Sequence, residues 1–221
     1  MKITDSYLDI TNWFFETLTP ILEKQGNVTV GLGGGGSFDS WYLQLIQNTK
    51  YKIQNEEEIF QKIHWCVTDE RVNCDISERN DGHIWEVFLG PLFEKYGISE
   101  ANFIRPAMDS DGAEYSERIG EIGIAFFGMG PDGHTASLFP HHPALQSEEL
   151  WFIKIDNAPK LPPERISLSP KSIQSLPHVC LFAAWESKKE ALANFLNETM
   201  STDDCPAKLL KPEIVYTSIK Y

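Results

Sequence analysis

The segment GMGPDGHTASLFP (residues 128–140) contains the residue types that a proton-transfer site requires. A neutral imidazole accepts a proton readily at physiological pH, since the reference pKa of histidine is about 6.5. The glycines around His134 predict a loop that brings backbone close to a ligand. Asp132 could fix the imidazole or contact a substrate, and Thr135 could cap a short helix expected over residues 136–139. A loop histidine that serves only in capping is the alternative.

The segment GLGGGGS (31–37) is suited to binding an anion. Its consecutive glycines leave backbone N–H groups unobstructed, and a helix expected to start at Asp39 adds the positive end of its dipole. No Lys-Ser or Lys-Thr follows, as a nucleoside-triphosphate loop would require, and the match to the dinucleotide pattern GxGxxG is weak. A phosphate or carboxylate site is therefore favoured, with a turn that binds nothing as the alternative.

Three basic residues are further candidates for binding an anionic ligand. VTDERV (67–72) places Asp69 and Arg71 two residues apart at a strand end, where an extended backbone would point both side chains the same way and a turn would change their directions. Arg71 could contact the anion, and Asp69 could orient Arg71 or a ligand hydroxyl. Arg165 follows a proline-rich loop, and Lys188 lies in the first turn of a predicted helix, where a cation is unfavourable unless an anion binds there. Ordinary surface charge or a surface ion pair is the alternative at each position.

The composition is that of a globular protein with an excess of acidic residues. The chain has 221 residues, of which 42% are hydrophobic, and its formal net charge is −13. These values predict a single domain over residues 1–221. The negative charge argues against nucleic acid and anionic membranes as partners, since both require an excess of lysine and arginine. An anionic ligand would therefore need basic residues that are gathered locally.

The N-terminal residues and the cysteines both favour a cytoplasmic protein. The N-terminus is acidic and amphipathic and lacks the apolar region of a signal peptide, and the longest apolar run, near IGIAFF, is much shorter than a membrane helix. The four cysteines form no CxxC pair, and no spacing of cysteine and histidine indicates a zinc site. We expect reduced thiols, no metal, and a monomer or weak homodimer.

Strand-like and helix-like segments alternate along the chain. Apolar spacing favours helices over 7–22, where Pro20 could kink or shorten the last turn, and over 39–47 and 186–198. A further helix is favoured over 81–97, with an interruption expected near Gly90-Pro91. Strands are predicted at 27–33, 63–68, 121–128, 151–155, 165–169, 179–185 and 213–218, with a short one at 102–106. This order predicts an α/β domain with a mostly parallel sheet and helices on both faces. Ligands of such sheets bind beyond the carboxyl ends of the strands, where all the candidate loops are expected to meet.

These segments together resemble the 6-phosphogluconolactonase family, within the larger glucosamine-6-phosphate isomerase/6-phosphogluconolactonase group. The similar segments occur in the family's order and are GGS (35–37), DERV (69–72), GMGPDGHTASLFP (128–140), PPERISLS (162–169) and ESKKEAL (186–192). The resemblance covers the chain from about residue 28 to its end, and segment 128–140 is the most specific part. It implies a modified Rossmann-like α/β fold. It also implies hydrolysis of 6-phospho-D-glucono-1,5-lactone to 6-phospho-D-gluconate, the second step of the oxidative pentose phosphate pathway.

The resemblance assigns roles to individual residues. His134 is similar to the family's general base, Asp132 to its companion, and Arg71 to an arginine near the substrate. The substrate-binding positions that it implies are Gly35, Gly36, Ser37, Asp69, Arg165 and Lys188, with the last two at basic positions that hold the phosphate.

The sequence departs from the family pattern at three places. Phe38-Asp39 follows Ser37 where Thr-Pro is usual, Arg79 precedes Asn80 where serine is usual, and Trp185 replaces a glycine.

The resemblance implies direct hydrolysis without a metal or an organic cofactor. His134 would take a proton from water, the water would attack the lactone carbonyl, and backbone N–H groups or Arg71 would stabilise the oxyanion. Glucosamine-6-phosphate deaminase/isomerase activity is one alternative. This alternative fits the chain less well, because those enzymes carry Glu and an Arg-rich stretch soon after the loop histidine, whereas here no carboxylate lies between His134 and Glu148. A non-catalytic sugar-phosphate-binding protein is another, which would not need Asp132 and His134 together.

Overall fold

The computed structural model describes residues 1–47 and 56–220. The strands are β1 (Lys2–Thr4), β2 (Val28–Leu32), β3 (Ile63–Val67), β4 (Asp69–Arg71), β5 (Ile122–Gly128), β6 (Phe152–Ile155), β7 (Arg165–Leu168), β8 (His178–Phe182) and β9 (Ile214–Tyr216). The α-helices are α1 (Tyr7–Gln25), α2 (Asp39–Gln47), α3 (Glu56–Gln61), α4 (Asn80–Ile84), α5 (Gly90–Tyr96), α6 (Ala113–Ile119), α7 (Pro170–Ser175) and α8 (Lys189–Leu196). No helix within these described ranges is long and apolar enough to cross a membrane.

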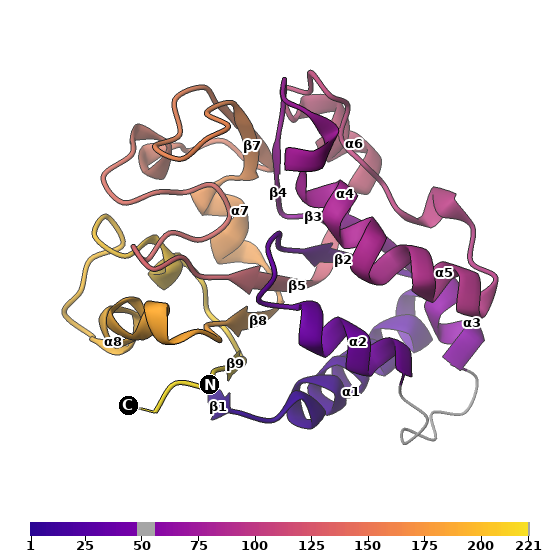
Figure 1. The fold of residues 1–221 in the computed structure, drawn as a ribbon. Coiled ribbons are helices and arrows are strands. Elements are labelled where there is room, and N and C mark those ends of the chain that lie inside the picture. The colour runs from indigo at the N-terminus through magenta and orange to yellow at the C-terminus, as the bar shows by residue number, and fades with distance from the viewer. Residues whose placement is uncertain (48–55, 221) are drawn as a thin grey trace.

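Six of the described strands form a parallel sheet at the centre of the molecule (Figure 1). Their order is β1-β9-β8-β5-β2-β3, and each neighbouring pair is parallel. From β2 the chain moves outward to β3, and from β5 it moves in the opposite direction to β8 and β9. The strand order therefore reverses between β2 and β5, which is the position where open α/β sheets bind ligands. The expected α/β fold with a mostly parallel sheet is confirmed.

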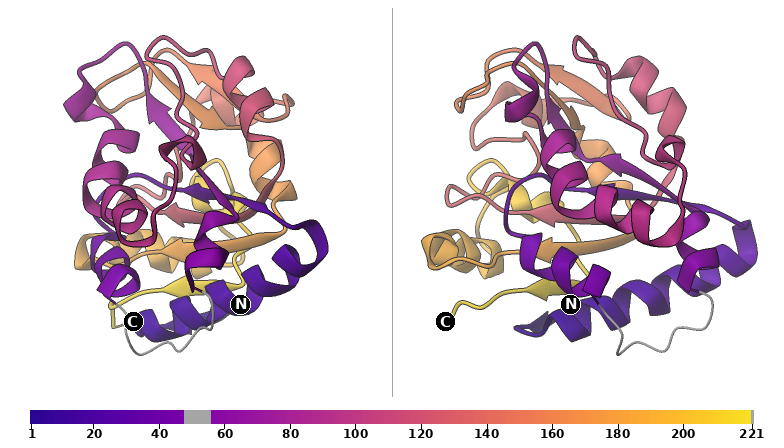
Figure 2. Two further views of the ribbon diagram at one scale, coloured as in Figure 1. Left: turned by 90° about the vertical axis from the view of Figure 1, so that its right-hand side faces the viewer. Right: turned by 45° about the vertical axis from the view of Figure 1, so that its right-hand side comes forward.

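A second sheet adjoins the end of β3 and is antiparallel. It has the order β4-β7-β6, and Figure 2 shows it on the opposite side of the molecule from α1. Only Thr68 separates β3 from β4, and its carbonyl accepts a hydrogen bond from the Leu168 N–H at 3.0 Å. The sequence predicted the strands near 151–155 and 165–169 but not their antiparallel pairing. The sequence left open whether residues 69–71 are extended or form a turn at the strand end; they are extended and form strand β4, because distant β7 supplies the ladder.

Helices α1 and α2 pack on the face of the central sheet that carries Phe126. The ring of Phe126 lies 5.5 Å from that of Phe14 in α1 and 4.6 Å from that of Trp41 in α2. Helix α1 forms because Ile10, Phe14 and Leu18 recur at four-residue steps and are fully buried on this face.

Four local expectations from the sequence are corrected by the structure. Helix α1 continues through Pro20 to Gln25, three residues beyond the expected end. Residues 136–139 form a tight turn rather than a helix, because Thr135 and Leu138 exchange backbone hydrogen bonds. Segment 102–106 makes a single bridge from Phe103 to Trp65 instead of a strand. The helix predicted over 81–97 is continuous in α4, the π-helix η2 (Trp85–Leu89) and α5, so that Gly90-Pro91 begins α5 without interrupting the helical path.

Candidate active site

A cavity of about 220 Å³ lies at the carboxyl edge of the central sheet. The loops after β2, β3 and β5 all contribute to it, as do Arg165 at the start of β7 and Lys188 after β8. The convergence expected from the strand order is therefore present in the structure. The lining residues are Gly33, Gly34, Gly35, Gly36, Ser37, Thr68, Asp69, Arg71, Asn80, Gly128, Met129, Gly130, Pro131, His134, Ala136, Arg165, Trp185 and Lys188.

His134 and Asp132 form a close pair beside the cavity. Nδ1 of His134 lies 2.5 Å from Oδ1 of Asp132, and the imidazole packs on the Phe139 ring at 4.8 Å. Gly130 is required here, because a Cβ at this position would lie 2.0 Å from the His134 ring. The Gly130 N–H also donates to the His134 carbonyl at 2.9 Å, which holds the loop closed. Asp132 thus occupies Nδ1, and Nε2 is the nitrogen that can accept a proton from a ligand in the cavity.

Lys160 joins this pair from the loop between β6 and β7. Its Nζ lies 3.0 Å from Oδ2 of Asp132 and 3.1 Å from Nδ1 of His134. Burial raises the pKa of the Asp132 carboxyl, but the hydrogen bonds and charges of His134 and Lys160 outweigh it and hold that pKa well below its usual range. Asp132 is therefore a carboxylate throughout the physiological pH range.

Lys188 and Ser37 form a second polar group of the cavity. The Lys188 side chain is buried, and its Nζ donates to the Ser37 Oγ at 2.7 Å while lying 4.8 Å from the centre of the Trp185 ring. Burial, followed by the positive charge of Lys160, lowers the pKa of Lys188 to about 8. Burying an ammonium is costly, and an anionic ligand group would compensate this cost.

Arg165 connects the cavity wall to the loop that carries Lys160. Its guanidinium donates to the carbonyls of Lys160, Leu161 and Pro162 at 3.0, 3.3 and 3.0 Å. Nη1 also donates to the Ser137 Oγ at 3.3 Å, and this hydroxyl donates to the Asp69 carboxylate at 2.7 Å. The pKa of the Arg165 guanidinium is lowered, and burial is the largest cause. Arg165 therefore brings a positive charge to the cavity and also fixes the backbone at residues 160–162.

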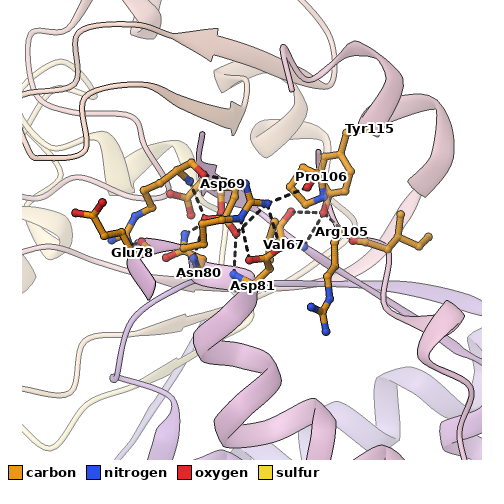
Figure 3. Close-up of polar contacts among 12 residues, drawn as sticks. Val67, Asp69, Glu78, Asn80, Asp81, Arg105, Pro106 and Tyr115 are labelled. Carbon is orange, nitrogen blue, oxygen red and sulfur yellow. Dashed lines mark hydrogen bonds and ion pairs between the residues drawn. The ribbon is translucent and has the colours of Figure 1, made fainter. Parts of the chain in front are cut away.

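A buried network of charged residues holds Asn80 at the other wall of the cavity (Figure 3). The Arg79 guanidinium makes two 3.0 Å hydrogen bonds to the Asp81 carboxylate, and the buried Glu70 carboxylate accepts the N–H groups of Asn80 and Asp81 at 2.7 Å each. Burial, followed by the charge of Asp81, raises the pKa of Glu70 to about 7.

The network determines where Asn80 and Arg71 lie. Asn80 donates to the Asp69 carbonyl at 2.9 Å, and a Cβ at Gly34 would lie 2.0 Å from its Oδ1. Nη1 of Arg71 donates to the Glu78 carbonyl. Among the residues that the structure describes, Nε of Arg71 is a buried donor without a partner.

Comparison with known proteins identifies the family. The family model of glucosamine-6-phosphate isomerases/6-phosphogluconolactonase matches residues 4–218. The chain belongs to this family. A 6-phosphogluconolactonase of Borreliella burgdorferi is 30% identical over 220 residues, covering 94% of this chain and 90% of the relative. A probable 6-phosphogluconolactonase 1 of Arabidopsis thaliana is 38% identical over 229 residues, covering 93% and 82%.

Two solved structures have the same fold as this chain. The crystal structure of 6-phosphogluconolactonase from Thermotoga maritima has a TM-score of 0.75 and 22% identity, covering 97% of this chain and 96% of that one. A 6-phosphogluconolactonase from Shewanella baltica has the same TM-score at 18% identity, covering 98% and 97%. At these identities the likeness concerns the fold alone.

The structure brings together the site residues that the sequence predicted. Eight of the nine line the cavity, namely Gly35, Gly36, Ser37, Asp69, Arg71, His134, Arg165 and Lys188, and Asp132 lies directly behind His134. Their individual roles remain predictions. Thr135 does not cap a helix; its hydroxyl donates to the Gly128 carbonyl at 2.9 Å.

Sequence reasoning missed Lys160 and Ser137 and treated Asn80 only as part of a departure from the family pattern. Lys160 could have been found from its position in the proline-rich loop before Arg165. No sequence signal identifies Asn80 or Ser137, because their positions in the site depend on contacts with residues 11 and 68 positions away.

The three departures from the family pattern have structural consequences. Phe38 is fully buried and packs on Phe182 at 4.7 Å, so it anchors the end of the glycine loop. Arg79 belongs to the buried charge network. Trp185 is half exposed and covers Lys188 at the cavity mouth.

Proposed function

We propose that this protein hydrolyses 6-phospho-D-glucono-1,5-lactone to 6-phospho-D-gluconate. The observation that carries the proposal is that His134, with Asp132 behind it, faces the same 220 Å³ cavity as Lys188 and Arg165. A base thus lies in one cavity with the two cations that suit a phosphate group. Membership of the family and the names of the 30% and 38% identical relatives support the same substrate.

The proposed reaction is general-base hydrolysis of the lactone ester. Nε2 of His134 takes a proton from a water molecule, whose oxygen attacks the lactone carbonyl carbon and places a negative charge on the carbonyl oxygen. Asp132 accepts the Nδ1–H of His134, fixes the tautomer and stabilises the imidazolium. When the oxyanion collapses, the ring C–O bond breaks and the imidazolium gives its proton to the leaving oxygen. The products are a hydroxyl and a carboxylic acid, which loses its proton at neutral pH.

The developing oxyanion and the phosphate require separate donors. Backbone N–H groups of the glycine loop and the Arg71 guanidinium line the cavity on the side of β2 and β4, and either can donate to the oxyanion. Removal of one such donor typically reduces the rate ~10²–10³-fold. Lys188, with Ser37 beside it, and Arg165 are assigned to the phosphate, since both carry positive charge in buried positions. Loss of an oxyanion donor should therefore lower the rate of hydrolysis, and loss of Lys188 or Arg165 should weaken the apparent affinity for the substrate.

The variant His134→Ala tests the proposal. We expect folding to be retained and lactonase turnover to fall by ~10²–10⁴-fold, the usual contribution of a general base. The assay follows acid release from freshly generated 6-phosphogluconolactone and subtracts its spontaneous opening, with circular dichroism as the check on folding. Near-normal turnover in the variant would refute the assignment of the base.

Isomerisation and deamination of glucosamine 6-phosphate are a second candidate, because the matched family includes glucosamine-6-phosphate isomerases. Such a reaction needs acid–base groups that move a proton between neighbouring carbons. In the part of the chain that the structure describes, Asp69 is the carboxylate that lines the cavity, and it already accepts a hydrogen bond from Ser137. The lactonase is therefore preferred. Ammonia release from glucosamine 6-phosphate, at a rate above that of lactone hydrolysis, would reverse this preference.

A further inference from the structure

The indole ring of Trp185 lies at the mouth of the cavity and contacts two segments of its wall. Nζ of Lys188 lies 4.8 Å from the centre of the ring. One edge of the ring lies close to the glycine loop, because a Cβ on Gly36 would be 3.6 Å from Cη2 and 3.7 Å from Cζ2 of Trp185. All three residues line the same cavity. The ring therefore spans from the loop after β8 to the loop after β2.

Trp185 occupies the outer position and Lys188 the inner one. Trp185 is 52% exposed, whereas Lys188, three residues later, is only 5% exposed. The Lys188 ammonium contacts the indole and also donates to the Ser37 Oγ at 2.7 Å. The face of an aromatic ring attracts a cation but does not neutralise it, as a carboxylate would. The ammonium is thus held in place, and its full charge stays available to an anion in the cavity.

The backbone does not require either tryptophan or glycine at position 185. Trp185 has φ −107° and ψ 146°, an extended conformation that any residue adopts. The glycine that is usual at this position in the family would leave that side of Lys188 open to water. Attraction between an ammonium and a phosphate weakens when water and salt reach the pair, because the effective dielectric constant rises and counterions screen the charges. The indole should therefore strengthen the hold of Lys188 on a phosphate.

We propose that Trp185 is a specificity-determining residue, whose indole shields the Lys188 ammonium from solvent and so increases the preference of the enzyme for a phosphorylated lactone. Trp185 acts through Lys188 and is in this sense a positioning residue. The inference rests on the proposed function, because that function assigns the phosphate of the substrate to Lys188. It predicts that loss of the indole affects binding of the phosphate and leaves the chemical step unchanged.

The first experiment measures kcat and KM for 6-phosphogluconolactone and for D-glucono-1,5-lactone. The proteins are the wild type, Trp185→Gly, Trp185→Phe and the control Trp151→Gly. Trp151 is 38% exposed and lines a separate groove near the first residues of β2, β5 and β8. In Trp185→Gly we expect KM for the phosphorylated lactone to rise about tenfold, the effect of a modest increase in the local dielectric constant, with kcat nearly unchanged. Activity on D-glucono-1,5-lactone should not change.

The pattern across the two lactones distinguishes shielding from other roles of the ring. An equal loss on both lactones would mean that the indole contacts the sugar or only supports the fold. A lower KM for the phosphorylated lactone in Trp185→Gly would mean that the ring obstructs the cavity, and an unchanged KM that it has no role. Each of these results overturns the inference. Trp185→Phe keeps an aromatic face and should retain most of the wild-type preference.

The second experiment needs no turnover. Binding of inorganic phosphate is measured by calorimetry at about 50 mM and about 500 mM NaCl, since salt screens exposed charges far more than buried ones. We expect Trp185→Gly to bind phosphate more weakly than the wild type and to lose more of its affinity when salt is added. Trp151→Gly and Trp185→Phe should resemble the wild type. Circular dichroism checks folding, and Trp185→Ala serves as a second variant.

The two experiments separate failure of the inference from failure of the proposed function. If Trp185→Gly and the wild type have the same phosphate affinity and the same response to salt, the inference is wrong, although lactone hydrolysis would still support the proposed function. If the glycine variant shows the expected loss of phosphate binding but the wild type hydrolyses neither lactone, the shielding of Lys188 is supported and the proposed reaction is refuted.

Discussion

The variant Gly130→Ala tests whether the position of the His134 ring determines the rate. An added Cβ would lie 2.0 Å from Cε1 and Nδ1 of His134 and 2.6 Å from Oδ1 of Asp132. Ordinary contact requires about 3.4 Å, so the imidazole has to move by roughly 1.4 Å. A displacement of about 1 Å can reduce a rate ~10²-fold, which corresponds to about 2.7 kcal/mol of transition-state free energy. We therefore expect kcat for lactone hydrolysis to fall by at least ~10²-fold.

The control adds a methyl group two residues earlier, at the end of strand β5. At Gly128 a Cβ would meet the Phe38 ring at 3.7 Å, an ordinary contact, so Gly128→Ala should lose far less activity than Gly130→Ala. Lactone-dependent acid release gives kcat, and thermal unfolding monitored by circular dichroism shows whether both variants fold. If Gly130→Ala were folded and had a kcat within about threefold of the wild type, the argument from imidazole position would be wrong.

Two further predictions concern charged groups in and beside the cavity. Lys188, with a pKa of about 8, attracts a phosphate dianion below that pH and loses its charge above it, so affinity for inorganic phosphate should fall as the pH rises through 8. Inhibition constants between about pH 7 and 9.5 measure this, and Lys188→Arg, which stays charged, should show a flat profile; identical profiles would contradict the assignment. Removal of the buried cation in Arg79→Met should lower the free energy of unfolding by ~3–5 kcal/mol in urea, because it leaves Glu70 and Asp81 without their partner. The exposed Arg118, paired with Glu114, is the control, and Arg118→Met should cost less than ~1 kcal/mol; equal losses would disprove the role of the network.

Local pattern was sufficient to predict the central sheet and the loops that carry the chemistry. Short apolar segments such as 121–128 can be recognised because a buried parallel strand is apolar along its length, as the burial of β5 shows. The parallel arrangement then places every loop after a strand at one edge. For this reason His134, Lys188 and the glycine loop could be assigned to one cavity from their order alone.

The second sheet shows where this reasoning fails. Asp69–Arg71 has the composition of a polar loop, and it becomes strand β4 only because Arg165–Leu168 pairs with it antiparallel. A ladder between segments almost a hundred residues apart leaves no mark on the composition of either. The same ladder fixes Asp69 and Arg71 on the cavity side, with Glu70 turned toward the Asn80 and Asp81 N–H groups.

The sequence by itself determined the α/β fold class, the family and the candidate base. Each depends on residue types at short spacings, and short spacings determine which local backbone structure forms. Only the tertiary structure decided that Lys160 lies against Asp132 and His134, and that Arg165 also holds the backbone of the loop carrying Lys160. The reason is physical. The contact between Lys160 and His134 depends on a distance of 3.1 Å between side chains 26 residues apart, and such distances are set by the packing of the whole chain.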